Sequence, residues 1–367
     1  MAGRYGEAVR LGIVVDYSDD FRAVVPQVQQ AEQLGVDLVS VAEAYSFDAV
    51  SRLGYLAAAT ERVVLQSAIL NVFSRTPAAL AMTAAGLDDV SGGRFELGLG
   101  ASGPQVVEGF HGVPYTAPLT RIRETVEVCR AVWRREPLAF DGRQVRVPLP
   151  ADEGTGLGKP LKLVNRPRRE RIPVAIAALT PKSVAQTAEI ADGWMPVFYL
   201  PERAQLAWGD ALDAGRAARD PALGALDVQV TMPLLVGEGP ALDAARAAYR
   251  DRLALYVGGM GARDANFYAD LAARYGLGEA AAVVQDRYLA GDKAGAADAV
   301  PDELVDGTAL IGDAAHVRAR LRSLAASGVT TLTVQPLAPT PEGRLEQIAT
   351  VRGLLDGLRP AEDEEGP

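Results

Sequence analysis

Apolar runs and amphipathic helical segments alternate along the whole chain. The apolar runs do not alternate with polar residues, which is typical of parallel strands covered by helices on their outer face. Eight strand–helix units can be distinguished, and eight such units close into a barrel. The sequence therefore predicts an α/β fold, a (β/α)8 TIM barrel. The expected strands are Leu11–Val15, Asp37–Val41, Val63–Ala68, Phe95–Gly98, Val174–Ala177, Trp194–Val197, Val228–Val236 and Thr330–Gln335.

Two segments interrupt the alternation. Residues 136–172 are rich in proline and glycine, and within them the centre of Leu138–Val147, Asp141-Gly142, favours a hairpin turn. The second segment, about 240–305, has a helical pattern. We expect a single barrel domain over residues 1–359 with these insertions after the fourth and seventh strands, and a disordered acidic tail at 360–367.

The composition excludes several classes of partner. The chain carries a formal net charge of −10, which disfavours nucleic acid and anionic membrane surfaces. No run approaches the roughly 20 apolar residues that cross a bilayer, and the first ten residues lack the apolar core of a secretory signal. The one cysteine, Cys129, is expected on the buried face of a helix, and with two histidines the sequence predicts no soft metal site. We expect a cytoplasmic protein that acts on a small molecule.

Gly98, Gly100 and Gly103 follow the fourth strand in the spacing G-x-G-x-x-G. A dinucleotide-binding fingerprint should open the first strand–helix unit, with an acidic residue about 20 positions later. Here three units precede the glycines, and a long amphipathic helix, Thr116–Arg135, follows them. The motif therefore predicts a later strand-to-helix loop whose backbone lies against a flat or anionic ligand.

In a barrel of this kind the site lies at the carboxyl ends of the strands. The first strand is followed by Asp16-Tyr17, the second by Glu43, and the third by Asn71. After the fifth strand, Thr180 is a suitable cap for the next helix, whose free N–H groups suit a phosphate. Glu43 has two interpretations, a functional acid or a partner of a lysine or arginine across the barrel mouth.

The strongest basic cluster lies in the first insertion. It consists of Arg166, Arg168, Arg169 and Arg171, with Lys159 and Lys162 just upstream. Such a run is usually a solvated loop. The alternative is that it receives the acidic tail of a ligand.

Five segments together resemble the luciferase-like monooxygenase superfamily, in its branch of coenzyme F-420-dependent (deazaflavin) oxidoreductases. The resemblance spans nearly the whole chain and implies a bacterial-luciferase-like TIM barrel, a homodimer, and a cofactor bound at the carboxyl face. The family commonly has a cis peptide bond in a bulge of the third strand, which by position is Ala68-Ile69. The segments are Val41–Tyr45, Ser91–Gly100, Val106–Pro114, Ala188–Trp194 and Gly258–Gly261.

The resemblance also implies roles for individual residues. The bulge and the glycine loop would line the cofactor, Asn71 and Glu43 would face its ring or the substrate, and a second group would hold its phosphate end. One departure is that Glu43 is followed by Ala44, where relatives that oxidise glucose 6-phosphate have histidine, and this argues against that reaction. The cofactor-binding residues implied are Ala68, Ile69, Asn71, Gly100, Ala101, Ser102, Gly103, Ala178, Leu179, Thr180, Lys182, Gly193 and Trp194.

Three functions remain open on this basis. The first is hydride transfer between coenzyme F-420 and an imine, enone, or ketone or alcohol, with Glu43, Tyr17 or His111 as proton donor and Arg166–Arg171 receiving the polyglutamyl tail. The second is an FMN-dependent monooxygenase that uses O2. The third is a flavin-binding barrel without catalysis. A loop histidine such as His111 is also compatible with simple solvent exposure.

Overall fold

The protein is described here by a computed structural model that covers residues 9–15, 17, 20–261, 263 and 265–358. The tail expected at 360–367 and the strand-end residue Asp16 lie outside these residues. No helix of the described residues is both long enough and apolar enough to span a bilayer.

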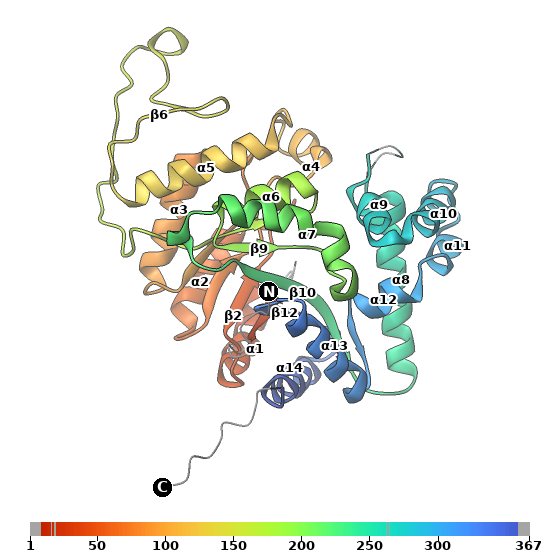
Figure 1. Ribbon diagram of the computed structural model, residues 1–367. Coiled ribbons are helices and arrows are strands. Elements are labelled where there is room, and N and C mark those ends of the chain that lie inside the picture. Colours follow the sequence, from red (N-terminus) through yellow and green to blue (C-terminus); the bar gives the residue numbers. More distant parts are fainter. Residues whose placement is uncertain (1–8, 16, 18–19, 262, 264, 359–367) are drawn as a thin grey trace.

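Eight parallel strands form a closed ring, so the predicted barrel is confirmed (Figure 1). β1 pairs with both β2 and β12, and the pairing of β10 with β9 completes the ring. The ring strands are β1 (Arg10–Val15), β2 (Leu38–Val41), β3 (Val64–Ser67), β5 (Phe95–Gly100), β8 (Val174–Ala177), β9 (Gly193–Met195), β10 (Asp227–Val236) and β12 (Thr331–Pro336).

Two short strands were not expected. β4 (Leu70–Asn71) resumes the line of β3 after a break at Ala68–Ile69 and pairs with the end of β5. β11 (Leu310–Gly312) pairs with the end of β10 outside the ring. Segments of two or three residues carry too little of a pattern to be recognised from sequence.

Helices cover the outer face of the ring, and their starts follow the capping rules. The side chains of Asp48, Thr76 and Thr180 each accept a hydrogen bond from the N–H three residues on. Cys129 and Trp133 are fully buried, as expected, and burial raises the pKa of the Cys129 thiol to about 12. The covering helices are α1 (Phe21–Gln33), α2 (Ala49–Ala59), α3 (Pro77–Val90), α5 (Pro118–Trp133), α6 (Pro181–Ile190), α7 (Pro201–Ala218), α13 (Ala314–Ala326) and α14 (Pro341–Asp356).

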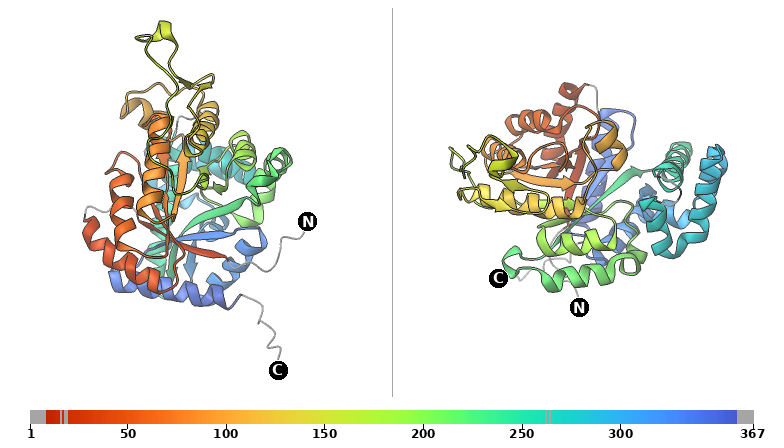
Figure 2. Two further views of the ribbon diagram at one scale, coloured as in Figure 1. Left: turned by 90° about the vertical axis from the view of Figure 1, so that its left-hand side faces the viewer. Right: turned by 90° about the horizontal axis from the view of Figure 1, so that it is seen from above.

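The first insertion projects from the barrel as an extended excursion (Figure 2). It contains the expected hairpin, formed by β6 (Phe140–Asp141) and β7 (Arg146–Val147), and a short helix η1 (Ala151–Glu153). The turn is 142–145 rather than centred on Asp141-Gly142, because Asp141 pairs with Arg146. Glu124 of α5 fixes this turn: its carboxylate accepts the N–H groups of residues 143, 144 and 145 at 2.7–2.8 Å.

The second insertion is a group of helices that stands beside the barrel (Figures 1 and 2). Gly258 and Gly259 allow close packing there, since a Cβ at either position would lie 2.4–2.5 Å from Tyr288. The helices are α8 (Pro240–Gly259), α9 (Phe267–Ala272), η3 (Ala273–Leu277), α10 (Gly278–Leu289), α11 (Lys293–Asp298) and α12 (Asp302–Gly307).

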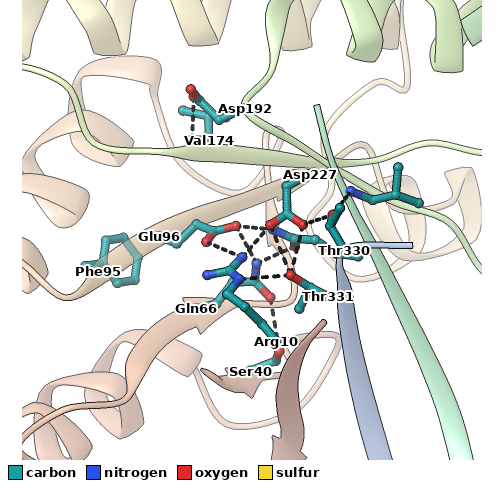
Figure 3. A network of polar contacts seen from close by, with 12 residues as sticks. Arg10, Ser40, Gln66, Phe95, Glu96, Val174, Asp192, Asp227, Thr330 and Thr331 are labelled. Atoms are coloured by element: carbon teal, nitrogen blue, oxygen red, sulfur yellow. Dashed lines mark hydrogen bonds and ion pairs between the residues drawn. The ribbon is translucent and has the colours of Figure 1, made fainter. Parts of the chain in front are cut away.

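A polar layer closes the amino-terminal end of the barrel (Figure 3). Gln66 donates to Glu96 at 2.8 Å and to Gln229 at 2.7 Å, and it accepts from Ser40 at 3.0 Å. Arg10 forms an ion pair with Asp227, which also accepts from Thr331 at 2.9 Å. Burial raises the pKa of Glu96. These residues occupy the first three positions of six strands, so this end of the barrel is filled by protein.

Candidate active site at the carboxyl ends of the strands

The break between β3 and β4 lies at the carboxyl edge of the ring. The peptide bond between Ala68 and Ile69 is cis, which confirms the expectation for this position. Ala68 N–H donates to the Val41 carbonyl at 2.8 Å, which ties the break to the end of β2. Beyond the break, Leu70 pairs with Leu99 and Asn71 with Gly100. The bulge therefore brings Ala68, Ile69 and Asn71 alongside the glycine loop.

The first two glycines of the loop are required by this packing. A Cβ on Gly98 would lie 1.7 Å from the Ser67 carbonyl oxygen, and one on Gly100 would lie 2.9 Å from the Ile69 side chain. The Ser67 hydroxyl donates to the Gly98 carbonyl and accepts its N–H, both at 2.9 Å. The expected close approach at Gly98 and Gly100 is thus made by β3 and the bulge.

The loop continues through Ala101, Ser102 and Gly103 into a short helix, α4 (Pro104–Gly109). Ser102 has a φ of +57°, a left-handed conformation that is unusual outside glycine. The Tyr115 hydroxyl donates to the Ser102 carbonyl at 3.2 Å, and burial raises the pKa of Tyr115. The hydroxyl therefore keeps its proton and helps to hold this part of the loop.

Asn71 presents an unused hydrogen-bond donor. Its Oδ1 accepts the Phe73 N–H at 2.9 Å, and the residue is 6% exposed. Its Nδ2 is buried and has no partner among the described residues. Buried amide donors in proteins are almost always paired, so an orphan at this edge fits a ligand acceptor.

Glu43 is paired with an arginine, as the second of its two interpretations expects. Its carboxylate binds Arg75 through two bonds of 2.7 and 3.0 Å and accepts the Ala49 N–H at 2.9 Å. The pKa of Arg75 is raised, chiefly by the hydrogen bond with Glu43. Both carboxylate oxygens are thus engaged by Arg75 or the Ala49 N–H, and this arrangement favours pairing over the donor role expected for Glu43.

The other two expected proton donors lie on different sides of the mouth. Tyr17 is 52% exposed and borders a cavity of about 460 Å³ between β1, α1 and α14. His111 is half-buried on the connection between α4 and α5, where its ring packs edge-on against Phe110, with centroids 5.3 Å apart. His111 is therefore the one placed directly after the glycine loop.

Two cations lie at the starts of α5 and α6. The Arg121 guanidinium lies 4.8 Å over the Phe73 ring, and its Nε is buried without a partner in the described part of the chain. Lys182 is exposed in the first turn of α6, and Gln186 of α6 donates to the Leu119 carbonyl at 2.9 Å, which holds the two helix starts together. The sequence analysis missed Arg121, although its position in the first turn after the glycine loop was visible.

Several polar groups of the loop after β8 already have hydrogen-bond partners within the protein. Thr180 accepts the Ser183 N–H at 3.3 Å, and Leu179 N–H donates to the Ser183 hydroxyl at 3.2 Å. The carbonyls of Ala178 and Leu179 accept the indole N–H groups of Trp194 and Trp208 at 2.9 and 2.8 Å. The loop is thus held from beneath by two buried rings.

Gly193 and Trp194 lie lower in the barrel than expected. Gly193 pairs with Ala175 and Asp227, and a Cβ there would lie 2.8 Å from Gln229 of the polar layer. Trp194 is 1% exposed and packs against Trp208. They begin β9 rather than end it, so their expected contact with a phosphate is corrected to support of the β8 loop.

The basic cluster lies at the opposite end of the barrel. Arg169 pairs with the buried Asp88 and donates to the carbonyl of Phe95, the first residue of β5. Arg171 pairs with Asp192, directly before β9. A segment that leads into a parallel strand reaches its amino end. The interpretation of this cluster as a tail-binding site at the carboxyl face is therefore wrong.

Comparison with known proteins agrees with this geometry. The family model described as luciferase-like monooxygenase matches residues 5–331. The chain belongs to this family. A Mycobacterium tuberculosis member, named "Putative coenzyme F-420-dependent oxidoreductase", is 39% identical over 355 residues, which cover 95% of this chain and 99% of the relative. The 5,10-methylenetetrahydromethanopterin reductase of Archaeoglobus fulgidus is 28% identical over 329 residues, 88% of this chain and 92% of the relative.

Solved structures of luciferase-like proteins share the fold. The coenzyme F-420-dependent tetrahydromethanopterin reductase from Methanopyrus kandleri matches with a TM-score of 0.77 at 21% identity, over 97% of this chain and 100% of that one. A type II Baeyer-Villiger monooxygenase from Pseudomonas putida, in complex with FMN, matches with a TM-score of 0.64 at 18% identity, over 95% of this chain and 98% of that one. These two structures share the barrel fold with this chain.

No group of three or more histidine, cysteine, aspartate or glutamate side chains is arranged to hold a metal ion within the residues that the structure describes. Buried donors without partners among the described residues at this face include Asn71 Nδ2 and Arg121 Nε, and Lys182 is exposed at the start of α6. They suit an organic ligand with ring acceptors at one end and negative charge at the other.

Proposed function

We propose that the protein is a coenzyme F-420-dependent oxidoreductase that transfers a hydride between the deazaflavin and a small organic substrate, such as an imine, an enone, or a ketone or alcohol. The observation that carries this is the 39% identity, over 99% of its length, with a relative named for that cofactor. The unpaired donors at the carboxyl edge support it independently.

The residues at the edge fit the parts of this cofactor. The bulge at Ala68–Ile69 and the loop Gly100–Gly103 offer backbone against which a flat ring can lie, and Asn71 Nδ2 would donate to an acceptor on that ring. Arg121 and Lys182 would bind the phosphodiester and the carboxylates of the tail. When bound, the deazaflavin supplies the hydride-transferring carbon, C5.

The protein would also supply a proton, because reduction of a carbonyl or imine adds a proton along with the hydride. His111 suits this role by its position after the glycine loop, and Tyr17 is the second candidate. Glu43 would act as a positioning residue that fixes Arg75 and the start of α2. His111→Gln should then lower kcat while F-420 binding persists.

The first test is a comparison of affinities. Purified protein would be titrated with coenzyme F-420 and with FMN, followed by intrinsic tryptophan fluorescence. We expect F-420 to bind more tightly, and Asn71→Ala to weaken it about tenfold, the loss of one buried hydrogen bond. Asn165→Ala, at an exposed asparagine in the projecting insertion, is the matched control. Tighter FMN binding would overturn the proposal.

An FMN-dependent monooxygenase is the second candidate, supported by the shared fold of the FMN-bound Baeyer-Villiger enzyme. Turnover with reduced FMN and O2 at rates above those with F-420 would favour it. Binding of F-420 without oxidation of its reduced form by any acceptor would favour a barrel that binds the cofactor without catalysis.

We also infer a homodimer formed through α3. Met82 and Val90 of this helix are 60% and 61% exposed. Large apolar side chains exposed on an outer helix are typical of subunit interfaces. Analytical ultracentrifugation should find a dimer, and Met82→Glu should shift it to a monomer; a monomeric wild type would contradict the inference.

A further inference from the structure

We propose that the substrate of this site is an apolar molecule without negative charge, bound against an aromatic rim made by Tyr45 and Phe110. The inference rests on the proposed function, and it names the class of acceptor that the oxidoreductase would take.

The rim consists of two exposed rings that meet across the barrel mouth. Tyr45 is 68% exposed and Phe110 is 64% exposed, and their ring centroids are 6.2 Å apart. Tyr45 comes from the loop after β2, whereas Phe110 ends α4, beyond the glycine loop after β5. Large aromatic side chains on separate loops that contact each other in the open are typical of a binding surface.

The rim stands over the proposed cofactor position. β2 pairs with β3, and β3 pairs with β5, so the two loops flank the strand end that carries Ala68–Ile69 and Asn71. Tyr45 lies two residues after Glu43, whose ion pair with Arg75 fixes the root of its loop. His111, the proposed proton donor, packs directly on Phe110. A substrate resting on the rim would thus lie near both the cofactor and a proton.

The charge around the rim opposes an anionic substrate. Residues 42–48 and 101–117, which form the two loops, contain no lysine or arginine and hold three carboxylates, Glu43, Asp48 and Glu108. Arg75 at the edge is occupied by Glu43. The Arg52 guanidinium lies over the Phe47 ring of the first loop, but it is 5% exposed. A phosphate or carboxylate against the Tyr45 and Phe110 rings would therefore lose hydration and find no lysine or arginine on the two loops to replace it.

Two cations of the carboxyl face, Arg121 and Lys182, come from outside the rim loops. They lie at the starts of α5 and α6, where the anionic end of the cofactor would bind. The Arg121 guanidinium lies over the Phe73 ring, which stacks on Tyr115, and in the proposed arrangement its charge is used by the cofactor tail.

The test uses two enones of the same skeleton, 4-phenylbut-3-en-2-one and its analogue with a carboxylate on the phenyl ring. Binding to the F-420-loaded protein would be measured by ligand-observed NMR. Reduction of the enone by the reduced cofactor would be measured by the rise in absorbance of oxidised F-420 as the hydride is transferred. We expect the neutral enone to bind and the carboxylate analogue to bind at least about tenfold more weakly. Equal binding of the two, or no binding of the neutral enone, would overturn the proposal.

Variants of the two rim residues test whether the substrate contacts them. Tyr45→Ala and Phe110→Ala should each raise the KM for the neutral enone about tenfold with little change in kcat, and Tyr45→Phe should restore the wild-type KM. Leu206→Ala, at a leucine of α7 that is also 64% exposed, is the control. An unchanged KM, or a changed oligomeric state with an unchanged KM, would assign the rim to contact between copies and overturn the proposal.

The affinity for F-420 distinguishes a failure of the proposed function from a failure of the proposed substrate class. If the wild type does not bind F-420, the proposed function fails. If the wild type and the rim variants bind F-420 equally but the neutral enone is not preferred, the substrate class alone is wrong.

Discussion

The two ends of this barrel differ in how their polar groups are paired. At the amino end, Gln66 and Glu96 form part of a connected layer, and Arg169 and Arg171 are joined to Asp88 and Asp192. At the carboxyl end, Asn71 Nδ2 and Arg121 Nε are buried without partners among the described residues. Satisfied networks add rigidity, whereas unpaired donors reduce stability until a ligand binds. Arg352 Nε, next to Gly35 and Asp37 at the amino end, also has no hydrogen-bond partner among the described residues, so the contrast concerns the strand ends around Asn71 rather than every polar group.

Most of the strained backbone lies at the carboxyl side. Among the described non-glycine residues with positive φ, Ser102, Ala117 and Phe198 belong to that side, with φ angles of +57°, +44° and +49°, and Arg135, at +56°, follows the end of α5. Such conformations cost free energy and persist where the surrounding structure imposes them, which is common at ligand sites. We therefore expect substitutions at the amino end to change stability, and substitutions at the carboxyl end to change binding.

The largest expected effect is on stability at the amino end. Asp88 is fully buried and binds Arg169 at 2.9 Å, so Asp88→Asn leaves a partly buried cation without its charge partner. We expect a loss of about 3 kcal/mol in the free energy of unfolding, measured by urea titration, with unchanged F-420 affinity in the folded protein. Asp89→Asn, at the exposed neighbour, is the control. A loss of F-420 affinity would break the separation of the two ends.

The next effect is on binding at the carboxyl end. Arg121→Met keeps a side chain over Phe73 but removes the charge, and it should weaken F-420 binding about tenfold, or about 1.4 kcal/mol, while the unfolding free energy stays the same. A deazaflavin riboside without the phosphate tail should bind both proteins equally.

Arg168→Met serves as the comparison for Arg121→Met, since Arg168 is exposed in the basic cluster at the other end. If Arg168→Met weakens F-420 binding as strongly as Arg121→Met does, the assignment of the tail to the carboxyl face is wrong.

A smaller effect is expected on the pH dependence of stability, through Glu96 of the polar layer. Burial raises the pKa of Glu96 above that of the unfolded chain, so the folded state favours the protonated form. The stability contributed by this residue is fully present below the ordinary glutamate pKa and is lost as the pH rises through the raised value. Glu96→Gln should remove this dependence, measured by urea titrations at low and at neutral pH. Identical pH dependence in the two proteins would contradict the assignment.

The smallest effect is expected for Glu43→Gln. If Glu43 only positions Arg75 and the start of α2, kcat should change less than about threefold and the pH profile should keep its shape. A proton donor at this position would instead lose about 10²- to 10⁴-fold in kcat. Steady-state kinetics across pH decide between the two, and a large loss would return Glu43 to the catalytic residues.

Much of the barrel was predictable from sequence, because strand and helix periods are local properties. Val174–Ala177 and Pro77–Val90 have the bounds that the pattern predicts, and β5 extends only two residues past Gly98. The third strand was expected to be continuous to Ala68, but it breaks there and resumes as β4. The pairing register with β5 sets the position of that break. The apolar pattern of one strand carries no information about register.

The site was less predictable. The wrong predictions concern the end of the barrel at which a residue lies. Arg169 and Trp194 carry suitable chemistry, but they precede or begin a strand and so lie toward the amino end. Arg121 was overlooked because a basic residue in a helix is ordinary until its partners are known to be missing. The cis bond at Ala68–Ile69 followed from family resemblance, since composition and periodicity carry no sign of it.

The carboxylate of Glu124 clamps the backbone of residues 143–145 to α5, and Arg135 after α5 donates to the carbonyl of Leu163 on the returning segment of the insertion. Beyond this clamp, residues 151–162 are exposed along their whole length. This makes the tip a natural place to lengthen, shorten or exchange the chain. A reporter peptide inserted at Gly156 would be carried by the enzyme without reaching the strands that build its site.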